Sequence, residues 1–243
     1  TVTLQDASGG YSGTRDVYLD SFNPGYAWGQ ANRMLEYANG YADLVRFAVF
    51  VSEGGPVPDG ATITSATLSL YKQSAYDQSY QLRRVLKDWV EGQATWNSAR
   101  TGTPWAVAGA SGVGSDIGAG VEATASIGWD PGWVNFDVTA GVSAMSTGVA
   151  NYGWKLQPVS GTSALKTFTS REGATPDQRP KLVVSYTQGT NALPTVSITS
   201  PAGGTSYTAP ASVVVNATAS DSDGSVTRVD FYAGTTLIGS DSS

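Results

Sequence analysis

Short runs of alternating apolar and polar residues recur along residues 1–187, and Gly, Asn and Pro separate one run from the next. A side-chain period of two is typical of strands with one buried face. About ten strands at this spacing predict an all-β domain built as a two-sheet β-sandwich or a jelly roll. The expected strands are Val2–Gln5, Arg15–Leu19, Met34–Tyr37, Leu44–Val51, Thr62–Lys72, Tyr80–Lys87, Val134–Asp137, Gly153–Gln157, Leu165–Arg171 and Lys181–Tyr186.

Two exceptions interrupt this pattern. One short helix is expected at Ala140–Ser146, with Thr139 as its N-cap. The stretch Glu91–Gly132 is rich in Gly, Ser and Ala and predicts a long loop folded across one end or face of the sandwich. Its tryptophans are expected to pin it there: Trp96, Trp105, Trp129 and Trp133.

The chain of 243 residues contains neither His nor Cys. This excludes a Ser-His-Asp triad, an imidazole base, a thiolate nucleophile, a disulfide framework and a His- or Cys-ligated metal. The formal net charge of −6, without a compensating basic cluster, argues against nucleic acid as a partner. A run of about 18 apolar residues is absent, so no membrane span is expected.

The composition changes near residue 188. Residues 188–194 are expected to form a linker, and the strands expected after it are Val196–Thr199, Ser212–Ala219 and Val226–Tyr232. The segments PTVSITSPAGGTSY, ASDSDGSVTRVDFYAG and TTLIGSD resemble the bacterial immunoglobulin-like repeat. Because such a domain needs about 90–100 residues, residues 195–243 are expected to be the N-terminal half of an immunoglobulin-like β-sandwich. Further chain, or strands of another chain, would complete it.

Three motifs distinguish residues 1–187. They are the WxEGxxTWN run at 89–97, the segment FTSREG at 168–173 and the segment RPKLVVSY at 179–186. In this order they resemble the bacterial DNRLRE-type domain, which overlaps carbohydrate-binding module family 96. The resemblance implies a secreted, extracellular, non-catalytic module that binds polysaccharide, with acidic alginate-type glycans favoured, and tethers a larger protein, a role compatible with the bacterial cell surface.

Basic residues inside the expected strands are candidate ligands for uronate carboxylates, which arginine binds with two parallel hydrogen bonds. These are Arg46, Arg83, Arg84, Lys166 and Arg171. Alternation is expected to turn them away from the core face that carries Phe47 and Phe168. The alternative is a structural network in which arginines pair with Glu36 or Glu172. Aromatic side chains that could stack on sugar rings are Tyr26, Trp28 and Tyr71.

A structural calcium ion is a further hypothesis, because calcium prefers carboxylate and other oxygen ligands. The candidate ligands are Asp16, Asp20 and Asn23 near the end of one strand, and Asp137. Asp16 could equally cap a turn.

Two other functions stay open. Unpaired strand edges of the incomplete second domain could complement a neighbouring chain and build a surface or adhesive assembly. A polysaccharide lyase without His would need Tyr71, Tyr80 or Lys166 as its base beside Arg46.

Overall fold

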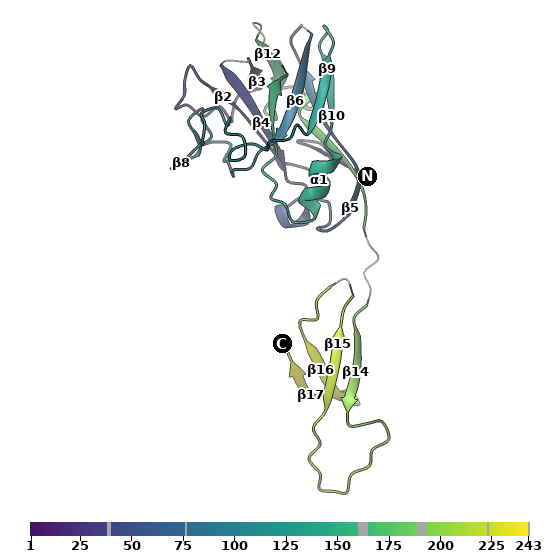
Figure 1. Ribbon diagram of the computed structural model, residues 1–243. Coiled ribbons are helices and arrows are strands. Elements are labelled where there is room, and N and C mark those ends of the chain that lie inside the picture. The colour runs from purple at the N-terminus through teal and green to yellow at the C-terminus, as the bar shows by residue number, and fades with distance from the viewer. Residues whose placement is uncertain (38–39, 76, 160–164, 189–192, 223, 243) are drawn as a thin grey trace. The chain divides into compact units, whose positions relative to one another are not determined.

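The computed structural model describes residues 1–37, 40–75, 77–159, 165–188, 193–222 and 224–242. The chain divides into two compact units, Thr1–Gln188 and Gly189–Ser243 (Figure 1). Within the described residues, no helix is long and apolar enough to span a membrane.

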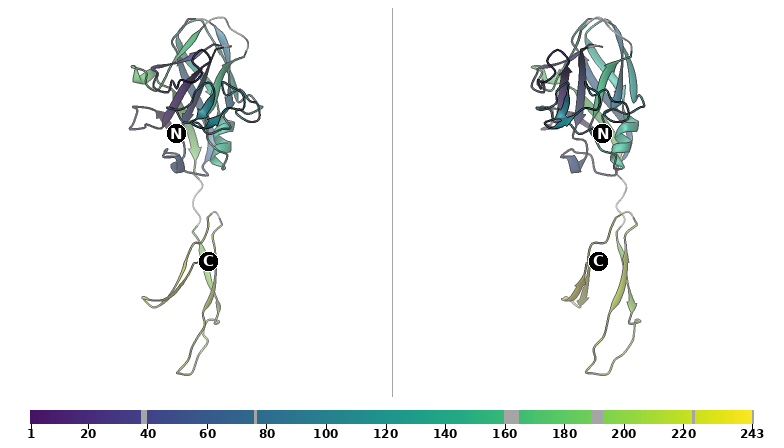
Figure 2. Two further views of the ribbon diagram at one scale, coloured as in Figure 1. Left: turned by 90° about the vertical axis from the view of Figure 1, so that its left-hand side faces the viewer. Right: turned by 60° about the vertical axis from the view of Figure 1, so that its left-hand side comes forward.

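The first unit consists mainly of two antiparallel sheets (Figure 2). One contains β1 (Val2–Gln5), β3 (Arg33–Glu36), β5 (Thr62–Lys72), β10 (Gly132–Asp137), β12 (Lys166–Thr169) and β13 (Lys181–Thr187). Its order is β1-β13-β5-β12-β3, and β10 pairs with β5. The other contains β2 (Thr14–Asp20), β4 (Tyr41–Phe47), β6 (Gln78–Arg84), β9 (Ala123–Ile127) and β11 (Trp154–Pro158), in the order β2-β4-β11-β6-β9. The predicted all-β sandwich is confirmed.

The main core lies between these two sheets. Leu68 and Phe136 from the six-stranded sheet and Phe47 and Trp154 from the five-stranded sheet are fully buried in one cluster. The pairing Phe136↔Leu68 shows how directly opposed residues share a sheet face. This core therefore follows from the alternation of the sequence, one strand residue in two facing inward.

A second apolar cluster covers the opposite face of β2 and β4. Val17 and Leu44 contribute from these strands, and Trp89 and Trp105 from the segment that follows β6. This segment contains the short hairpin β7 (Ser98–Arg100) and β8 (Thr103–Pro104). The expectation of a segment packed across one face of the sandwich agrees with this cluster.

The expected extent of the loop Glu91–Gly132 is wrong, because β9 lies within it and pairs with β6. Trp105 is buried and Trp96 packs against the second cluster, whereas Trp129 and Trp133 are 58% and 37% exposed. The latter two therefore do not anchor the segment in the core. They flank the start of β10 instead.

The predicted helix is present as α1 (Thr139–Ser146), with Val142 buried. Thr139 is its first residue and not its N-cap, a position that Val138 occupies. The reason is a local hydrogen bond: the Thr139 hydroxyl donates to Asp137 Oδ1 at 2.6 Å and is thus tied to the end of β10. The sequence prediction placed the helix correctly and its cap one residue too late.

The second unit consists of two separate hairpins. One pairs β14 (Thr195–Ser200) with β15 (Asn216–Ser220), and the other pairs β16 (Val229–Ala233) with β17 (Thr236–Asp241). No residue described between 193 and 242 is fully buried. The alternating strands of this unit thus leave apolar side chains exposed, among them Ile198 at 65%.

Candidate functional site

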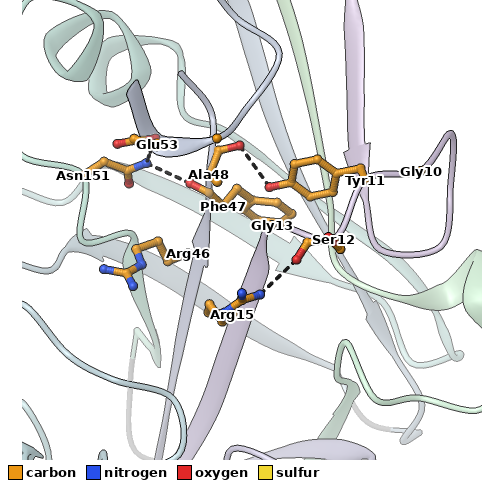
Figure 3. Close-up of a pocket in the computed structure, with 11 residues that line it drawn as sticks. Gly10, Tyr11, Ser12, Gly13, Arg15, Arg46, Phe47, Ala48, Glu53 and Asn151 are labelled. Atoms are coloured by element: carbon orange, nitrogen blue, oxygen red, sulfur yellow. Dashed lines mark hydrogen bonds between the residues drawn. The ribbon is translucent and has the colours of Figure 1, made fainter. Parts of the chain in front are cut away.

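An open pocket of about 510 Å³ lies beside the start of β2 and the end of β4 (Figure 3). Its lining residues are Gly10, Tyr11, Ser12, Gly13, Arg15, Arg46, Phe47, Ala48, Glu53, Gly54 and Asn151. Arg15 and Arg46 are direct register partners across β2 and β4, so their side chains leave the sheet on the same face. The pocket therefore holds two guanidinium groups from neighbouring strands.

The segment 88–91 holds both of these arginines. Arg46 Nη1 lies 3.2 Å from Asp88 Oδ1, and its guanidinium carbon lies 5.4 Å from the centre of the Trp89 ring. Arg15 Nε lies 3.9 Å from Glu91 Oε2. The side chain of Arg15 is 41% exposed and that of Arg46 is 27% exposed. The WxEG motif thus fixes two cations that remain accessible from the pocket.

Asn151 and Glu53 complete the pocket wall. Asn151 Nδ2 donates to Phe47 O at 2.8 Å and to Glu53 Oε2 at 2.9 Å (Figure 3). Glu53, the last residue of the 3₁₀ turn η1 (Val51–Glu53), also accepts the main-chain N–H of Val49 through Oε2 at 2.9 Å. Its carboxylate is therefore hydrogen-bonded to the chain around this turn. The remaining charged groups that line the pocket are the two arginines.

Tyr11 forms the opposite side of the pocket. Its hydroxyl donates to Ala48 O at 3.1 Å, and burial raises its pKa, so the hydroxyl is neutral. Gly13 permits this position, since a Cβ there would lie 2.7 Å from Tyr11 Oη and 2.8 Å from Ala48 Cβ. A ring held in this way offers an apolar edge beside two cations, an arrangement suited to a sugar acid.

Behind the pocket, two of the sequence motifs meet in a buried charged cluster. Arg171 Nε lies 2.6 Å from Glu172 Oε1 and 3.0 Å from Glu91 Oε1, and Glu91 Oε1 accepts the Asp16 N–H at 2.9 Å. Asp16 Oδ2 accepts the Arg171 N–H at 2.7 Å. The WxEG and SREG segments are far apart in sequence and here share one ion-pair network.

Burial dominates the electrostatics of this cluster. It raises the pKa of Glu91 to about 7 and raises the pKa values of Asp16 and Glu172 as well. One carboxylate oxygen from each of the three residues lies within 4.8 Å of the other two, a spacing that a metal ion could use. Arg171 already supplies a positive charge at this position.

The structure separates the four predicted calcium ligands. Asp16 lies in the cluster just described, whereas Asp20 accepts hydrogen bonds at 2.8 Å from Phe22 N and from Asn23 Nδ2 in the turn after β2. Asp137 accepts the Thr139 N–H at 3.0 Å before α1. Asp20 and Asn23 are thus brought together, and Asp16 and Asp137 lie elsewhere.

The predicted basic residues are also distributed over several surroundings. Arg46 lies in the pocket and Arg171 in the buried cluster. The side chain of Arg83 donates to the carbonyl oxygens of Gly118 and Ala119. Arg84, the next residue of β6, lies opposite Trp154 of β11 in the strand register. Successive residues alternate between the faces of a strand, so Arg83 and Arg84 face opposite sides.

Lys166 differs from the expectation most clearly. It is 1% exposed, and Phe168, two residues further along β12, is fully buried as well. The expected orientation of Lys166 away from Phe168 is therefore wrong, because residues two apart in a strand share a face.

The predicted aromatic residues lie outside the pocket. Tyr26 is 59% exposed and its ring centre lies 4.4 Å from that of Trp28, which in turn stacks on Tyr18. Tyr71 is half-buried and lies edge-on to Trp133. Tyr26 remains an accessible platform, and Trp28 supports it.

Sequence reasoning missed Tyr11, Arg15, Glu53 and Asn151. Arg15 stands in an expected strand, but its place beside Arg46 depends on the register between β2 and β4. Asn151 and Glu53 come from segments between strands, and neither belongs to a recognisable motif.

Comparison with known families supports one part of the chain. Residues 194–243 match the family model of the bacterial Ig domain. A search of curated proteins finds no match to the sequence. The immunoglobulin-like character expected for the second unit is thereby confirmed.

Proposed function

We propose that the first unit is a secreted, non-catalytic carbohydrate-binding module for acidic polysaccharide. The ligand would lie in the pocket of Tyr11, Arg15, Arg46 and Asn151, with its carboxylates on the two guanidinium groups. The resemblance of the 89–97, 168–173 and 179–186 segments to the DNRLRE-type domain supports this assignment. It favours alginate-type glycans among acidic polysaccharides.

The opposition of Arg15 and Arg46 carries the proposal. Like charges directly across an antiparallel pair destabilise a sheet. An anion between the two guanidinium groups would offset this repulsion, and planar guanidinium groups match carboxylates in geometry. Asp88 and Glu91 contact the same arginines, so they orient the groups and leave part of each exposed.

The chemistry of the pocket suits binding better than turnover. Tyr80 and Lys166, candidate bases for a lyase, are 0% and 1% exposed, and neither lines the pocket of Arg46. Tyr71 is half-buried against Trp133 and also lies outside the pocket lining. A base near a bound uronate would have to come from other groups.

The test is titration of the full chain with polyuronates and with neutral polysaccharides, at low and moderate salt. Arg46→Gln and Arg15→Gln should each weaken uronate binding by about tenfold to a hundredfold, the loss of a charge-assisted hydrogen bond. Arg228→Gln makes the same charge change in the second unit and should bind like the wild type. Binding should also weaken as salt rises.

Any one of three results would contradict the proposal. These are a wild type that binds no uronate, pocket variants that bind uronate as tightly as Arg228→Gln does, and a rise in ultraviolet absorbance from newly formed unsaturated sugar ends. The last result would assign a lyase and not a binding module.

A surface or adhesive role is the second candidate, and the second unit favours it. Its match to the bacterial Ig domain suggests a spacer or surface structure, and its hairpins expose Val196, Ile198 and Ile238 at 64%, 65% and 60%. Such strands could pair with strands of a second copy. Sedimentation over a range of concentrations tests this, since a mass that stays monomeric would rule out self-association.

A further inference from the structure

Two buried carboxylates lie where the chain passes from one sheet to the other. Glu36 is the last residue of β3 in the six-stranded sheet, and Asp43 lies in β4 of the five-stranded sheet. Between them, Tyr37 and Tyr41 form an isolated antiparallel β-bridge. Both side chains are 1% exposed. Tyr80, from β6, is 0% exposed and its titration responds to the charges of both acids. Two acids and one phenol thus share the interior of the sandwich.

Four oxygen atoms of these residues have no hydrogen-bond partner among the described parts of the chain. They are Glu36 Oε2, Asp43 Oδ1, Asp43 Oδ2 and Tyr80 Oη. Buried polar atoms in folded proteins are almost always hydrogen-bonded, so four such atoms on three residues that influence one another's titration require an explanation. The carboxylate oxygens are acceptors; the main-chain N–H of Leu35 acts on the Asp43 carboxyl and that of Asp43 on the Glu36 carboxyl, but neither forms a hydrogen bond of normal geometry with the four atoms named above.

No lysine or arginine in the described ranges forms an ion pair with Glu36 or Asp43. The field of Lys155 reaches Glu36, but its Nζ donates to Gly109 O at 2.8 Å, Ala110 O at 3.2 Å and Ser111 Oγ at 2.9 Å. Burial raises the pKa of both Glu36 and Asp43 well above the usual range, because ionising them in the interior is costly even with Lys166 directly across the strand pair from Glu36. A positive species bound between them would remove this cost.

The geometry points to a buried cation site formed by Glu36, Asp43 and Tyr80, with Ca²⁺ as the ion it suits best. All four orphaned atoms are oxygens, the ligands that hard divalent cations prefer. Ca²⁺ accepts irregular sets of carboxylate, hydroxyl and carbonyl oxygens, whereas Mg²⁺ demands near-ideal octahedral geometry and keeps several waters. The Tyr80 hydroxyl stays protonated, because burial raises its pKa, and would bind through a lone pair.

This site would have a structural effect. Its ligands come from β3 in one sheet and from β4 and β6 in the other, so a bound ion would cross-link the two layers of the sandwich. Binding to the folded state alone raises stability by mass action. At a hundredfold excess of Ca²⁺ over its Kd, the melting temperature should rise by about 5 °C or more.

The site differs from the cluster of Asp16, Glu91 and Glu172. In that cluster Arg171 supplies a positive charge beside Glu91 and donates hydrogen bonds to the carboxylates of Asp16 and Glu172. Glu172→Gln therefore serves as a matched control, since it removes one acidic charge from the competing group.

The experiment compares the full chain after treatment with a chelator, with and without added Ca²⁺. Ca²⁺ binding is followed by calorimetry and by melting temperature, and Tb³⁺ is used as a luminescent substitute excited through neighbouring aromatic rings. Asp43→Asn and Glu36→Gln should each weaken Ca²⁺ binding about tenfold or more, because ligand charge sets calcium affinity. Glu172→Gln should bind as the wild type does.

Tyr80→Phe provides a variant that should fold in any case, since its hydroxyl has no hydrogen bond to lose. It should weaken Ca²⁺ and Tb³⁺ binding several-fold. The proposal is overturned if the wild type binds neither ion, if Tyr80→Phe binds both ions like the wild type, or if Glu172→Gln abolishes binding. Unchanged affinity in a folded Asp43→Asn variant would overturn it equally.

Discussion

Glu91→Gln is expected to stabilise the protein at neutral pH, although Glu91 lies close to two arginines. Its carboxylate is 3.0 Å from Arg171 Nε and 3.9 Å from Arg15 Nε. Burial nevertheless raises its pKa from 4.5 to about 7, with the nearby charge of Glu172 acting in the same direction. The free energy needed to remove the Glu91 carboxylate from water is therefore larger than the stabilisation that its two ion pairs provide.

The size of the effect follows from the shift in pKa. The folded protein holds the Glu91 proton more tightly than the unfolded chain, so this contribution to stability is complete below about pH 4.5 and is lost as the pH rises to about 7. A pKa raised from 4.5 to about 7 corresponds to about 3.5 kcal/mol, at about 1.4 kcal/mol for each pKa unit. The partners of Glu91 are more exposed, with the side chains of Arg171 and Glu172 22% and 20% exposed, and solvent screening through them reduces the figure to about 2 kcal/mol. Gln is neutral at every pH, like the protonated acid, so the Glu91→Gln variant does not lose this stability as the pH rises.

The assay is urea unfolding followed by tryptophan fluorescence, which reports the first unit because all seven tryptophans lie between Trp28 and Trp154. At about pH 4 wild type and Glu91→Gln should be equally stable, and at about pH 8 the variant should be more stable by about 2 kcal/mol. Asp177→Asn, at an exposed position of the turn η2 (Pro176–Gln178), is the control and should show no such pH-dependent difference. A Gln variant less stable than wild type at pH 8 would refute the reasoning and show that the ion pairs outweigh burial.

Three further substitutions, each measured by urea unfolding, test the pocket wall, the main core and a buried carboxylate of the first unit. Gly13→Ala places a Cβ 2.7 Å from Tyr11 Oη and should cost about 1–3 kcal/mol, whereas no loss would mean that Tyr11 moves freely. Phe136→Ala empties a fully buried position and should cost about 3–5 kcal/mol. Asp116→Asn should cost about 2 kcal/mol near pH 7 and little at low pH. Burial alone would raise the Asp116 pKa, but hydrogen bonds from Ala106 N and other donors lower it, so its stabilisation is lost as the pH falls.

The strand pattern predicted the sandwich because alternation reports which side chains one strand buries. It does not report which strands become neighbours. Arg46 was identified as a candidate from its place in an apolar strand, but the pairing Arg15↔Arg46 depends on the register of β2 against β4. Register follows from the three-dimensional arrangement of both sheets, so the pocket could not be found from the sequence.

The interior charges escaped prediction for another reason. Lys166 and Lys72 are 1% and 0% exposed, although lysine is normally a surface residue. They follow the inward face of β12 and β5 toward the end of the sandwich, where Lys72 Nζ donates to Gly128 O. A long aliphatic side chain can bury its stem while its ammonium group reaches polar atoms beyond the core. Strand alternation places Lys166 on the same face as Phe168, two residues away, whereas its residue type predicts an exposed side chain, and the prediction from the sequence followed the residue type.

Two of the three motifs on which the resemblance rests, the WxEG and SREG segments, meet in one ion-pair network. In a chain with only 14% charged residues, Asp88, Glu91 and Arg171 are concentrated behind one pocket and contact its two arginines or each other. Arginine loses considerable side-chain freedom when it binds a ligand, and holding it beforehand reduces that cost. Arg46 is held between Asp88 and the Trp89 ring, and Arg15 beside Glu91. Asp88, Trp89 and Glu91 therefore orient the two guanidinium groups that would meet an anionic ligand, and Trp89 also packs in the second apolar cluster.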